Sequence, residues 1–183
     1  MTYASVNDVI ERLILPNEGG YVNDSRDAGG ETNWGITVAT ARSQGYSGAM
    51  RDMPRSFAVE VYRRLYAIAP GFDMIFAQDA GVGALLIDIG VNMGPAVAGT
   101  FLQRCLNALN NGGKDYSDLV LDGGCGPKTR GALAAYLAKR GKPGGAVLAA
   151  AIKGLRTERY VALCEARGAN EAFAYGWLTR AAA

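Results

Sequence analysis

The chain has 183 residues, 49% of them hydrophobic, and a formal net charge of +2. This length suits one compact unit with a sizeable core, and so small a positive charge does not indicate a nucleic-acid partner. Histidine is absent from the sequence, which excludes Ser-His-Asp and Cys-His catalysis and zinc sites built on histidine. Chemistry is left to carboxylates, Tyr, Lys, Ser and Thr.

The sequence carries no sign of a membrane span or a secretion signal. No apolar run reaches the roughly 18 residues that a span requires, and the N-terminus lacks a basic start and a small-residue cleavage site. We therefore expect synthesis in the cytoplasm without a signal peptide. The three cysteines, Cys105, Cys125 and Cys164, are widely spaced, which favours free and mostly buried thiols.

The first predicted element is a helix that leads to an acidic residue. Apolar residues recur at helical spacing over residues 6–14, and Ser5 is a suitable N-cap. Pro16 disturbs a simple extension of the helix, and Gly19-Gly20 favours its end. Glu18 is therefore expected in a kinked last turn or just beyond the helix.

A glycine-rich polar segment follows over residues 21–36, and it predicts a short hairpin, the only β structure expected. Thr37 can cap a short helix that ends near Ser43. The next helix is expected over residues 55–67, with one apolar side.

Residues 82–91 are apolar on nearly all sides, which is typical of a buried central helix. Asp88 interrupts this helix, and a buried carboxylate must be paired or hydrogen-bonded. We expect its partner to be an arginine or a helix N-terminus.

The remaining sequence predicts further helices over residues 95–109, 127–139, 146–166 and 170–180. Phe173 and Trp177 of the last helix are expected in the core. The glycine-rich turn over residues 122–127 is interpreted as a cap of the helix that starts at Pro127, because it offers too few oxygens for a calcium loop.

The segment after the first helix carries a long motif of mixed residue types. It reads Glu18-Gly19-Gly20-Tyr21, followed by Asp24, Asp27, Gly29-Gly30, Thr32-Asn33 and Gly35-Ile36-Thr37. This motif resembles the signature of glycoside hydrolase family 108, lysozyme-like muramidases of phage endolysins and secretion-associated proteins. Residues further along resemble the predicted peptidoglycan-binding region of that family: Asp88, Asn92, Gly94, Phe101-Leu102-Gln103, Asp122-Gly123, Gly126-Pro127, Thr129, Ala132-Leu133, Gly176-Trp177 and Arg180.

The resemblance implies a mainly α, lysozyme-like α+β fold, with a small β-hairpin beside the catalytic helix and a helical C-terminal lobe. It implies a catalytic region over residues 1–92 and a peptidoglycan-binding-like region over residues 93–183, packed into one compact unit. The expected partner is the peptidoglycan glycan strand, with a holin or a secretion system for export to the periplasm or cell wall. Neither a cofactor nor a metal is implied, and we expect a monomer.

Within the motif, Glu18 is the candidate general acid. Its place at a helix C-terminus and its projection from an apolar face both raise a carboxyl pKa, as a general acid at neutral pH requires. The second catalytic carboxylate is expected to be Asp27, with Asp24 as the alternative, although both are also good turn formers. Thr32 either holds the attacking water or bonds within the hairpin.

Tyr21, Asp24, Asn33, Trp34 and Asn92 are the candidate substrate-binding residues. Tyr21 can stack on a pyranose or anchor the turn through its hydroxyl, and Trp34 can line the sugar cleft or pack the hairpin on the helices. Glu31 is expected to be a solvated charge of the hairpin.

The expected reaction is hydrolysis of the β-1,4 bond between N-acetylmuramic acid and N-acetylglucosamine by carboxylate acid/base catalysis. Inversion and retention are both compatible with these residues. The alternatives are a lytic transglycosylase and a non-catalytic protein that binds the cell wall or assists secretion.

Overall fold

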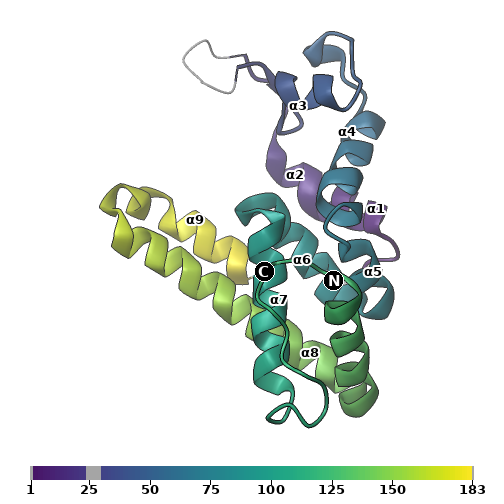
Figure 1. Ribbon diagram of the computed structural model, residues 1–183. Helices are drawn as coiled ribbons and strands as arrows, with labels where there is room; N and C mark the ends of the chain where they lie inside the picture. The colour runs from purple at the N-terminus through teal and green to yellow at the C-terminus, as the bar shows by residue number, and fades with distance from the viewer. Residues whose placement is uncertain (1, 24–29, 183) are drawn as a thin grey trace.

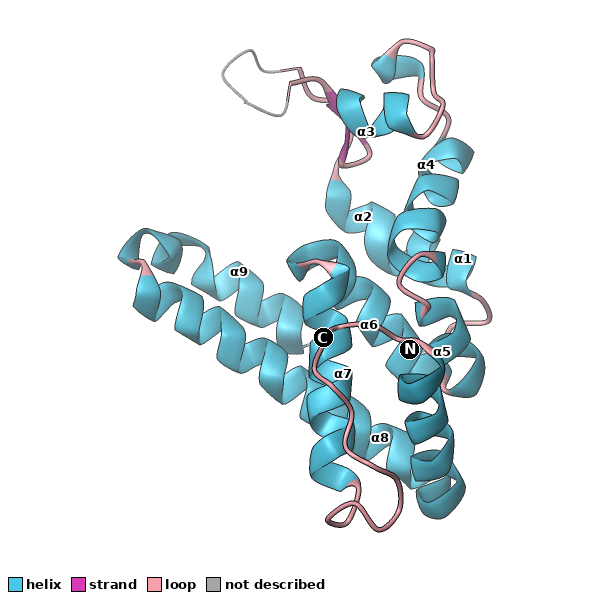
Figure 2. Cartoon of the chain, in the orientation of Figure 1, coloured by secondary structure: helices cyan, strands magenta, loops and turns pink. Residues whose placement is uncertain are grey.

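The computed structural model describes residues 2–23 and 30–182, and these residues are mainly helical (Figures 1 and 2). The α-helices are α1 (Val6–Val9), α2 (Leu15–Glu18), α3 (Val38–Ser43), α4 (Arg55–Tyr62), α5 (Phe72–Gln78), α6 (Ala80–Met93), α7 (Pro95–Leu109), α8 (Pro127–Ala166) and α9 (Glu171–Ala182). The other elements are the π-helical η1 (Ile10–Ile14) and η3 (Arg63–Ile68), the 3₁₀ turns η2 (Met50–Asp52) and η4 (Gly168–Asn170), and the strands β1 (Thr32–Asn33) and β2 (Ile36–Thr37). The predicted α+β class with one small hairpin is confirmed.

The first helix runs through α1, η1 and α2 and ends on Glu18, as predicted. The Ser5 hydroxyl accepts a hydrogen bond from the backbone N–H of Asp8 (3.1 Å), which confirms the N-cap. Pro16 lies in the first turn of α2, where its missing N–H is tolerated. The chain leaves the helix at Gly19, whose φ of 75° favours glycine.

The hairpin is short and tightly turned. Thr32 pairs with Thr37, Asn33 pairs with Ile36, and an isolated bridge joins Val22 to Thr32. The two turn residues between the strands, Trp34 and Gly35, both have positive φ (53° and 73°), as a type I′ turn requires. Thr37 then caps α3 by accepting a hydrogen bond from the N–H of Thr40 (3.2 Å), as predicted.

Helix α6 is the centre of the fold, with every residue from Val82 to Gly90 buried. Helices α5, α7 and α8 pack against it (Figure 1). Helix α7 starts at Pro95, directly after Gly94, as predicted. The sequence analysis missed α5, a short helix that begins after Gly71 (φ 78°) and ends at Gln78.

Helix α8 is two helical segments that meet at Gly141, which has φ 61° and ψ −160°. This kink agrees with the predicted break between helices 127–139 and 146–166. The second segment and α9 run antiparallel as a helical pair (Figure 2). Because α9 packs mainly on α8, its outer side faces solvent. Phe173 is 60% exposed and Trp177 only partly buried, so the prediction that both belong to the core was wrong.

The cysteines agree with the sequence analysis: all three are free, Cys105 and Cys125 are buried, and Cys164 is partly buried. Among the helices of the described residues, none is long and apolar enough to cross a membrane.

Asp88 joins three helices through one buried carboxylate. It is 4% exposed, and its Oδ2 accepts a hydrogen bond from Nη1 of Arg156 in α8 (2.8 Å). Its Oδ1 accepts hydrogen bonds from Arg180 in α9, from Nη2 at 2.7 Å and from Nε at 3.2 Å. The expected arginine partner is confirmed, and there are two of them.

Replacing Asp88 with Asn should lower the free energy of unfolding by about 3–5 kcal/mol, because the buried Arg156 would lose its counterion. Guanidinium denaturation followed by circular dichroism measures this loss. Glu11→Gln is the matched control, since it removes an exposed ion pair with Arg55, and it should cost about 0–1 kcal/mol. Equal small losses in the two variants would contradict this account.

Candidate active site

The last residue of α2, Glu18, lies against the turn of the hairpin. Its side chain is 22% exposed. A Cβ atom built on Gly35 would lie 2.8 Å from Oε2 of Glu18 and 2.7 Å from the hydroxyl of Tyr62. The backbone of the turn therefore approaches the carboxylate as closely as only a glycine allows.

Burial raises the pKa of the Glu18 carboxyl, and this desolvation is the largest influence on it. The guanidinium of Arg180 acts in the opposite direction and lowers this pKa, while the negative charge of Asp88 raises it further. The raised pKa favours the protonated carboxyl that can donate a proton.

Arg180 connects Glu18 to the buried ion pairs. Its Nη1 lies 3.9 Å from Oε1 of Glu18, while Nη2 bonds Asp88 at 2.7 Å. Helix α9, at the end of the chain, thus places the positive charge of Arg180 beside Glu18, which lies near the N-terminus. The sequence analysis noted Arg180 only as part of a closing motif, and no local pattern could have paired it with Glu18.

Two tyrosines of the α4–η3 helix support the same carboxylate, and sequence reasoning missed both. The hydroxyl of Tyr62 donates to the backbone carbonyl of Trp34 in the turn (2.9 Å). The ring of Tyr62 stacks with that of Tyr66, with centroids 5.6 Å apart. Burial raises the pKa of both hydroxyls, so both remain neutral, and the Tyr62 hydroxyl holds the turn beside Glu18.

Two of the predicted cleft residues form hydrogen bonds that hold the hairpin. Asn33 is 4% exposed, and its Nδ2 donates to the carbonyl of Met50 (2.7 Å). This burial and hydrogen bond give Asn33 a structural role, and its contact with a sugar stays a prediction. Trp34 is partly buried, and its Nε1 donates to the carbonyl of Met53 (3.2 Å), which supports the packing alternative for this residue.

Tyr21 and Glu31 pair with each other at the base of the hairpin. The Tyr21 hydroxyl donates to Oε1 of Glu31 (2.7 Å), and the guanidinium of Arg51 lies over the Tyr21 ring, 5.4 Å from its centroid. The anchoring alternative for Tyr21 is therefore favoured. The expectation that Glu31 is simply a solvated charge was wrong, because its carboxylate accepts this bond.

The structure describes Thr32 and Asn92 but not the candidate second carboxylates. Thr32 lies in β1 with its side chain partly buried. Asn92 is exposed one helical turn after Asp88, and its Oδ1 accepts a hydrogen bond from the Tyr160 hydroxyl (2.5 Å). Asp24 and Asp27 lie outside the described residues. No three carboxylate or thiol side chains of residues 2–23 and 30–182 cluster as a metal site requires.

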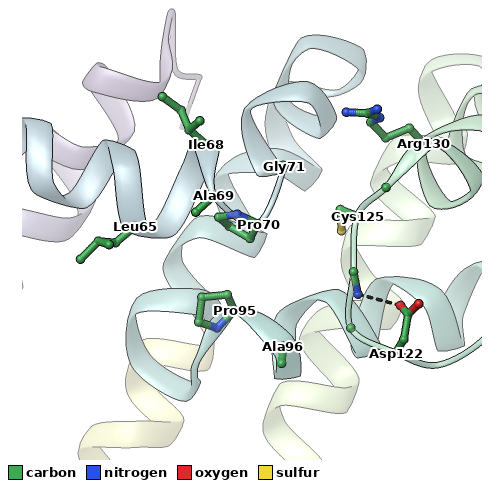
Figure 3. A pocket seen from close by; sticks show the side chains of 13 residues that line it. Leu65, Ile68, Ala69, Pro70, Gly71, Pro95, Ala96, Asp122, Cys125 and Arg130 are labelled. Carbon is green, nitrogen blue, oxygen red and sulfur yellow. Dashed lines mark hydrogen bonds between the residues drawn. The ribbon is translucent and has the colours of Figure 1, made fainter.

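Two cavities open in the described part of the chain. The smaller, about 170 Å³, is lined by Asn92, Met93, Arg159, Tyr160, Leu163 and Trp177. The larger, about 630 Å³, lies between the end of η3, the start of α7 and the turn at 122–126 (Figure 3). The smaller cavity includes one of the predicted substrate residues, Asn92, and the larger includes none.

The turn beside the larger cavity is organised by hydrogen bonds, with Gln103 at its centre. The Nε2 of Gln103 donates to Asp122 (2.7 Å), and its Oε1 accepts from the N–H of Gly123 (2.8 Å). The Thr129 hydroxyl donates to the carbonyl of Gly124 (2.8 Å). These hydrogen bonds favour the structural interpretation of this turn, although no side chain caps the helix at Gly126.

Comparison with known proteins agrees with the resemblance seen in the sequence. The family model described as Glycosyl hydrolase 108 matches residues 12–94, and the model described as Predicted Peptidoglycan domain matches residues 97–182. No curated protein matches the chain.

Among solved structures, one titled "Structure of Brucella abortus SagA" is similar over nearly the whole chain. The sequences are 25% identical, the TM-score is 0.62, and the match covers 96% of this chain and 89% of that one. With both family models and this structure in agreement, the first half of the chain is a glycosyl hydrolase 108 domain, the second half is a peptidoglycan domain, and the protein is a peptidoglycan hydrolase.

Proposed function

We propose that the protein is a muramidase of the lysozyme type, which hydrolyses the β-1,4 bond between N-acetylmuramic acid and N-acetylglucosamine. The observation that carries the proposal is the environment of Glu18. This carboxyl ends a helix, lies against a fixed backbone turn and has a pKa raised by burial. Those are the properties of a general acid in a glycosidase.

In the proposed reaction, protonated Glu18 donates its proton to the glycosidic oxygen. The bond between that oxygen and the anomeric carbon breaks, its electron pair stays on the leaving oxygen, and positive charge develops on the sugar ring. Water then adds to the anomeric carbon and loses a proton. The hydrogen bond from Tyr62 to the turn helps to keep the Glu18 carboxyl in its orientation during these steps.

The second carboxylate of this mechanism is Asp27, with Asp24 as the alternative, and Thr32 holds the attacking water. The bridge between Val22 and Thr32 supports this assignment, because it joins the two ends of the segment that contains both aspartates. Val22 and Thr32, on either side of that segment, therefore both lie at the hairpin whose turn approaches Glu18.

The setting of the reaction follows from its substrate. The second half of the chain is a peptidoglycan domain, so the proposed enzyme acts in the periplasm or cell wall. That it acts as a monomer stays a prediction. Export through a holin pore, as for a prophage endolysin, or through a secretion system, as for a secretion activator, remains a prediction from the sequence.

Glu18→Gln should reduce release of soluble fragments from purified peptidoglycan by at least ~10²-fold, since the glycosidic oxygen would lose its proton donor. Mass spectrometry of the fragments measures both the loss and the chemistry. Reducing muramic-acid ends from the wild type are expected. Glu11→Gln, on an exposed part of the same helix, should keep wild-type activity.

Two other results of that experiment would contradict the muramidase. Anhydromuramic ends would identify a lytic transglycosylase. A wild type that binds peptidoglycan but releases no fragments would identify a cell-wall-binding protein.

Gly35→Ala should lower kcat/KM by about 10²-fold, because the new methyl group would displace the Glu18 carboxylate and the Tyr62 hydroxyl. Gly45→Ala is the matched control. Gly45 also has positive φ (90°), yet a Cβ there would meet nothing within 4 Å, so it reproduces the backbone strain without the clash. Equal losses of kcat/KM in the two variants would show that strain alone explains the effect.

Arg180→Gln should shift the basic limb of the pH profile of kcat/KM to higher pH. Arg180 lowers the pKa of Glu18, so its removal raises that pKa, and the protonated acid persists to higher pH. Arg180→Lys keeps the positive charge and should shift the limb less. The profile is measured on soluble glycan fragments, and a shift to lower pH in Arg180→Gln would contradict Glu18 as the titrating acid.

A further inference from the structure

The smaller cavity is one helical turn away from the ion pairs that reach Glu18. Asn92 follows Asp88 by four residues on α6, and Trp177 precedes Arg180 by three residues on α9. Residues at these spacings lie on the same helix face, about 5 Å apart along the axis. Helices α6 and α9 therefore meet at the contact between Arg180 and Asp88, and one turn further along each helix they line the cavity.

One wall of the cavity is a fixed row of aromatic rings. Tyr160 stacks on Trp177 with centroids 5.4 Å apart, and Phe173 continues the row 6.0 Å from Trp177. Tyr160 is buried, its hydroxyl bonds Asn92, and the guanidinium of Arg156 lies over its ring. Towards Phe173, which is 60% exposed, the row opens to solvent. A rigid and partly exposed aromatic surface suits the apolar face of a pyranose ring.

Two polar groups at the cavity are free to bind a ligand. The Oδ1 of Asn92 is engaged by Tyr160, while its Nδ2 has no hydrogen-bond acceptor among the described residues and can donate to the carbonyl of an acetamido group. Arg159 is a partly buried residue, and its guanidinium forms no salt bridge or hydrogen bond with any residue that the structure describes. An unpaired guanidinium at a cavity suits a carboxylate.

We propose that this cavity is a subsite for an N-acetylmuramoyl unit of the glycan strand that is cleaved at Glu18. Its sugar ring packs on Trp177, its acetamido carbonyl accepts from Asn92, and Arg159 pairs with a carboxylate of its muramoyl substituent. That carboxylate belongs to the lactyl group in strands without peptide and to the peptide stem in strands that carry it. The inference rests on the proposed function and adds a specificity for muramoyl units over plain N-acetylglucosamine.

The test measures binding to the Glu18→Gln protein, which keeps the ligand intact. Isothermal titration calorimetry compares chitotetraose, which has no carboxylate, with glycan tetrasaccharides of peptidoglycan, with and without peptide. Arg159→Gln, added to this protein, should weaken binding of the peptidoglycan glycans by about tenfold or more and leave chitotetraose unchanged. Loss with the peptide-free glycan assigns the lactyl carboxylate, and loss only with the peptide-bearing glycan assigns the stem.

Matched control variants distinguish a loss of binding at the cavity from the general effect of removing a charge or a surface side chain. Arg167→Gln removes an exposed arginine outside the cavity and should change nothing. Trp177→Ala should weaken all three glycans by several-fold, while Tyr175→Ala, at a side chain that is 86% exposed on the same helix, should not. Equal losses in Arg159→Gln and Arg167→Gln, or wild-type affinity in Trp177→Ala, would overturn the proposal.

Cleavage by the wild type separates this inference from the proposed function. If the wild type releases no fragments but the binding pattern holds, the subsite stands and the muramidase assignment fails. If the wild type cleaves the glycan and Arg159→Gln binds all ligands normally, the subsite alone is wrong. Arg159→Gln leaves the aromatic row intact. The proposal can therefore be tested even if Trp177→Ala disturbs the folding of α9.

Discussion

The buried carboxylate of Asp88 is the constraint on which the rest of the structure depends. It accepts hydrogen bonds from Arg156 and Arg180, which follow it by 68 and 92 residues in the chain. A buried arginine is stable only with a counterion, so α8 and α9 must both return to α6. Since Arg180 also lies 3.9 Å from Glu18, the contact that closes the fold also sets the charge around the candidate acid.

A second constraint acts from the other side of Glu18. The turn formed by Trp34 and Gly35 needs positive φ at both residues, and the absence of a side chain at Gly35 lets the turn meet the carboxylate. Tyr62 fixes this contact through the carbonyl of Trp34. Glu18 is thus held between a hairpin of the first half and an arginine of the second, which explains its partial burial. This burial raises the pKa of the Glu18 carboxyl, and Arg180 acts against that rise.

Local signals in the sequence predicted most of the fold. Ser5 and Thr37 revealed their helix starts, apolar periodicity revealed the first helix and α6, and the glycines at 141–145 marked the kink in α8. The hydrogen bonds of Asn33, in β1, and of Glu31, just before it, were not predictable in this way, because so short a hairpin has no periodicity to separate inward from outward side chains. The pairing of Arg180 with Glu18 was also missed, since contacts across 162 positions leave no local pattern. Asp88 was predictable in part. Its position in an apolar helix required a charged or hydrogen-bonding partner, but only the fold shows that Arg156 and Arg180 are both partners.

Helix α9 lines the smaller cavity and also places a cation beside Glu18. A division of the chain into a catalytic half and a binding half would assign these two roles to different halves. Trp177 and Arg180 lie on one face of it, so the helix that walls the cavity also carries the cation beside Glu18. At 3.9 Å, Arg180 and Glu18 interact through charge rather than through a hydrogen bond. Such an interaction changes smoothly with distance, so any displacement of α9 changes the pKa of Glu18. A ligand that packs on Trp177, as proposed, would therefore act on the candidate acid through the same helix, and the peptidoglycan domain would contribute Arg180 to the candidate active site.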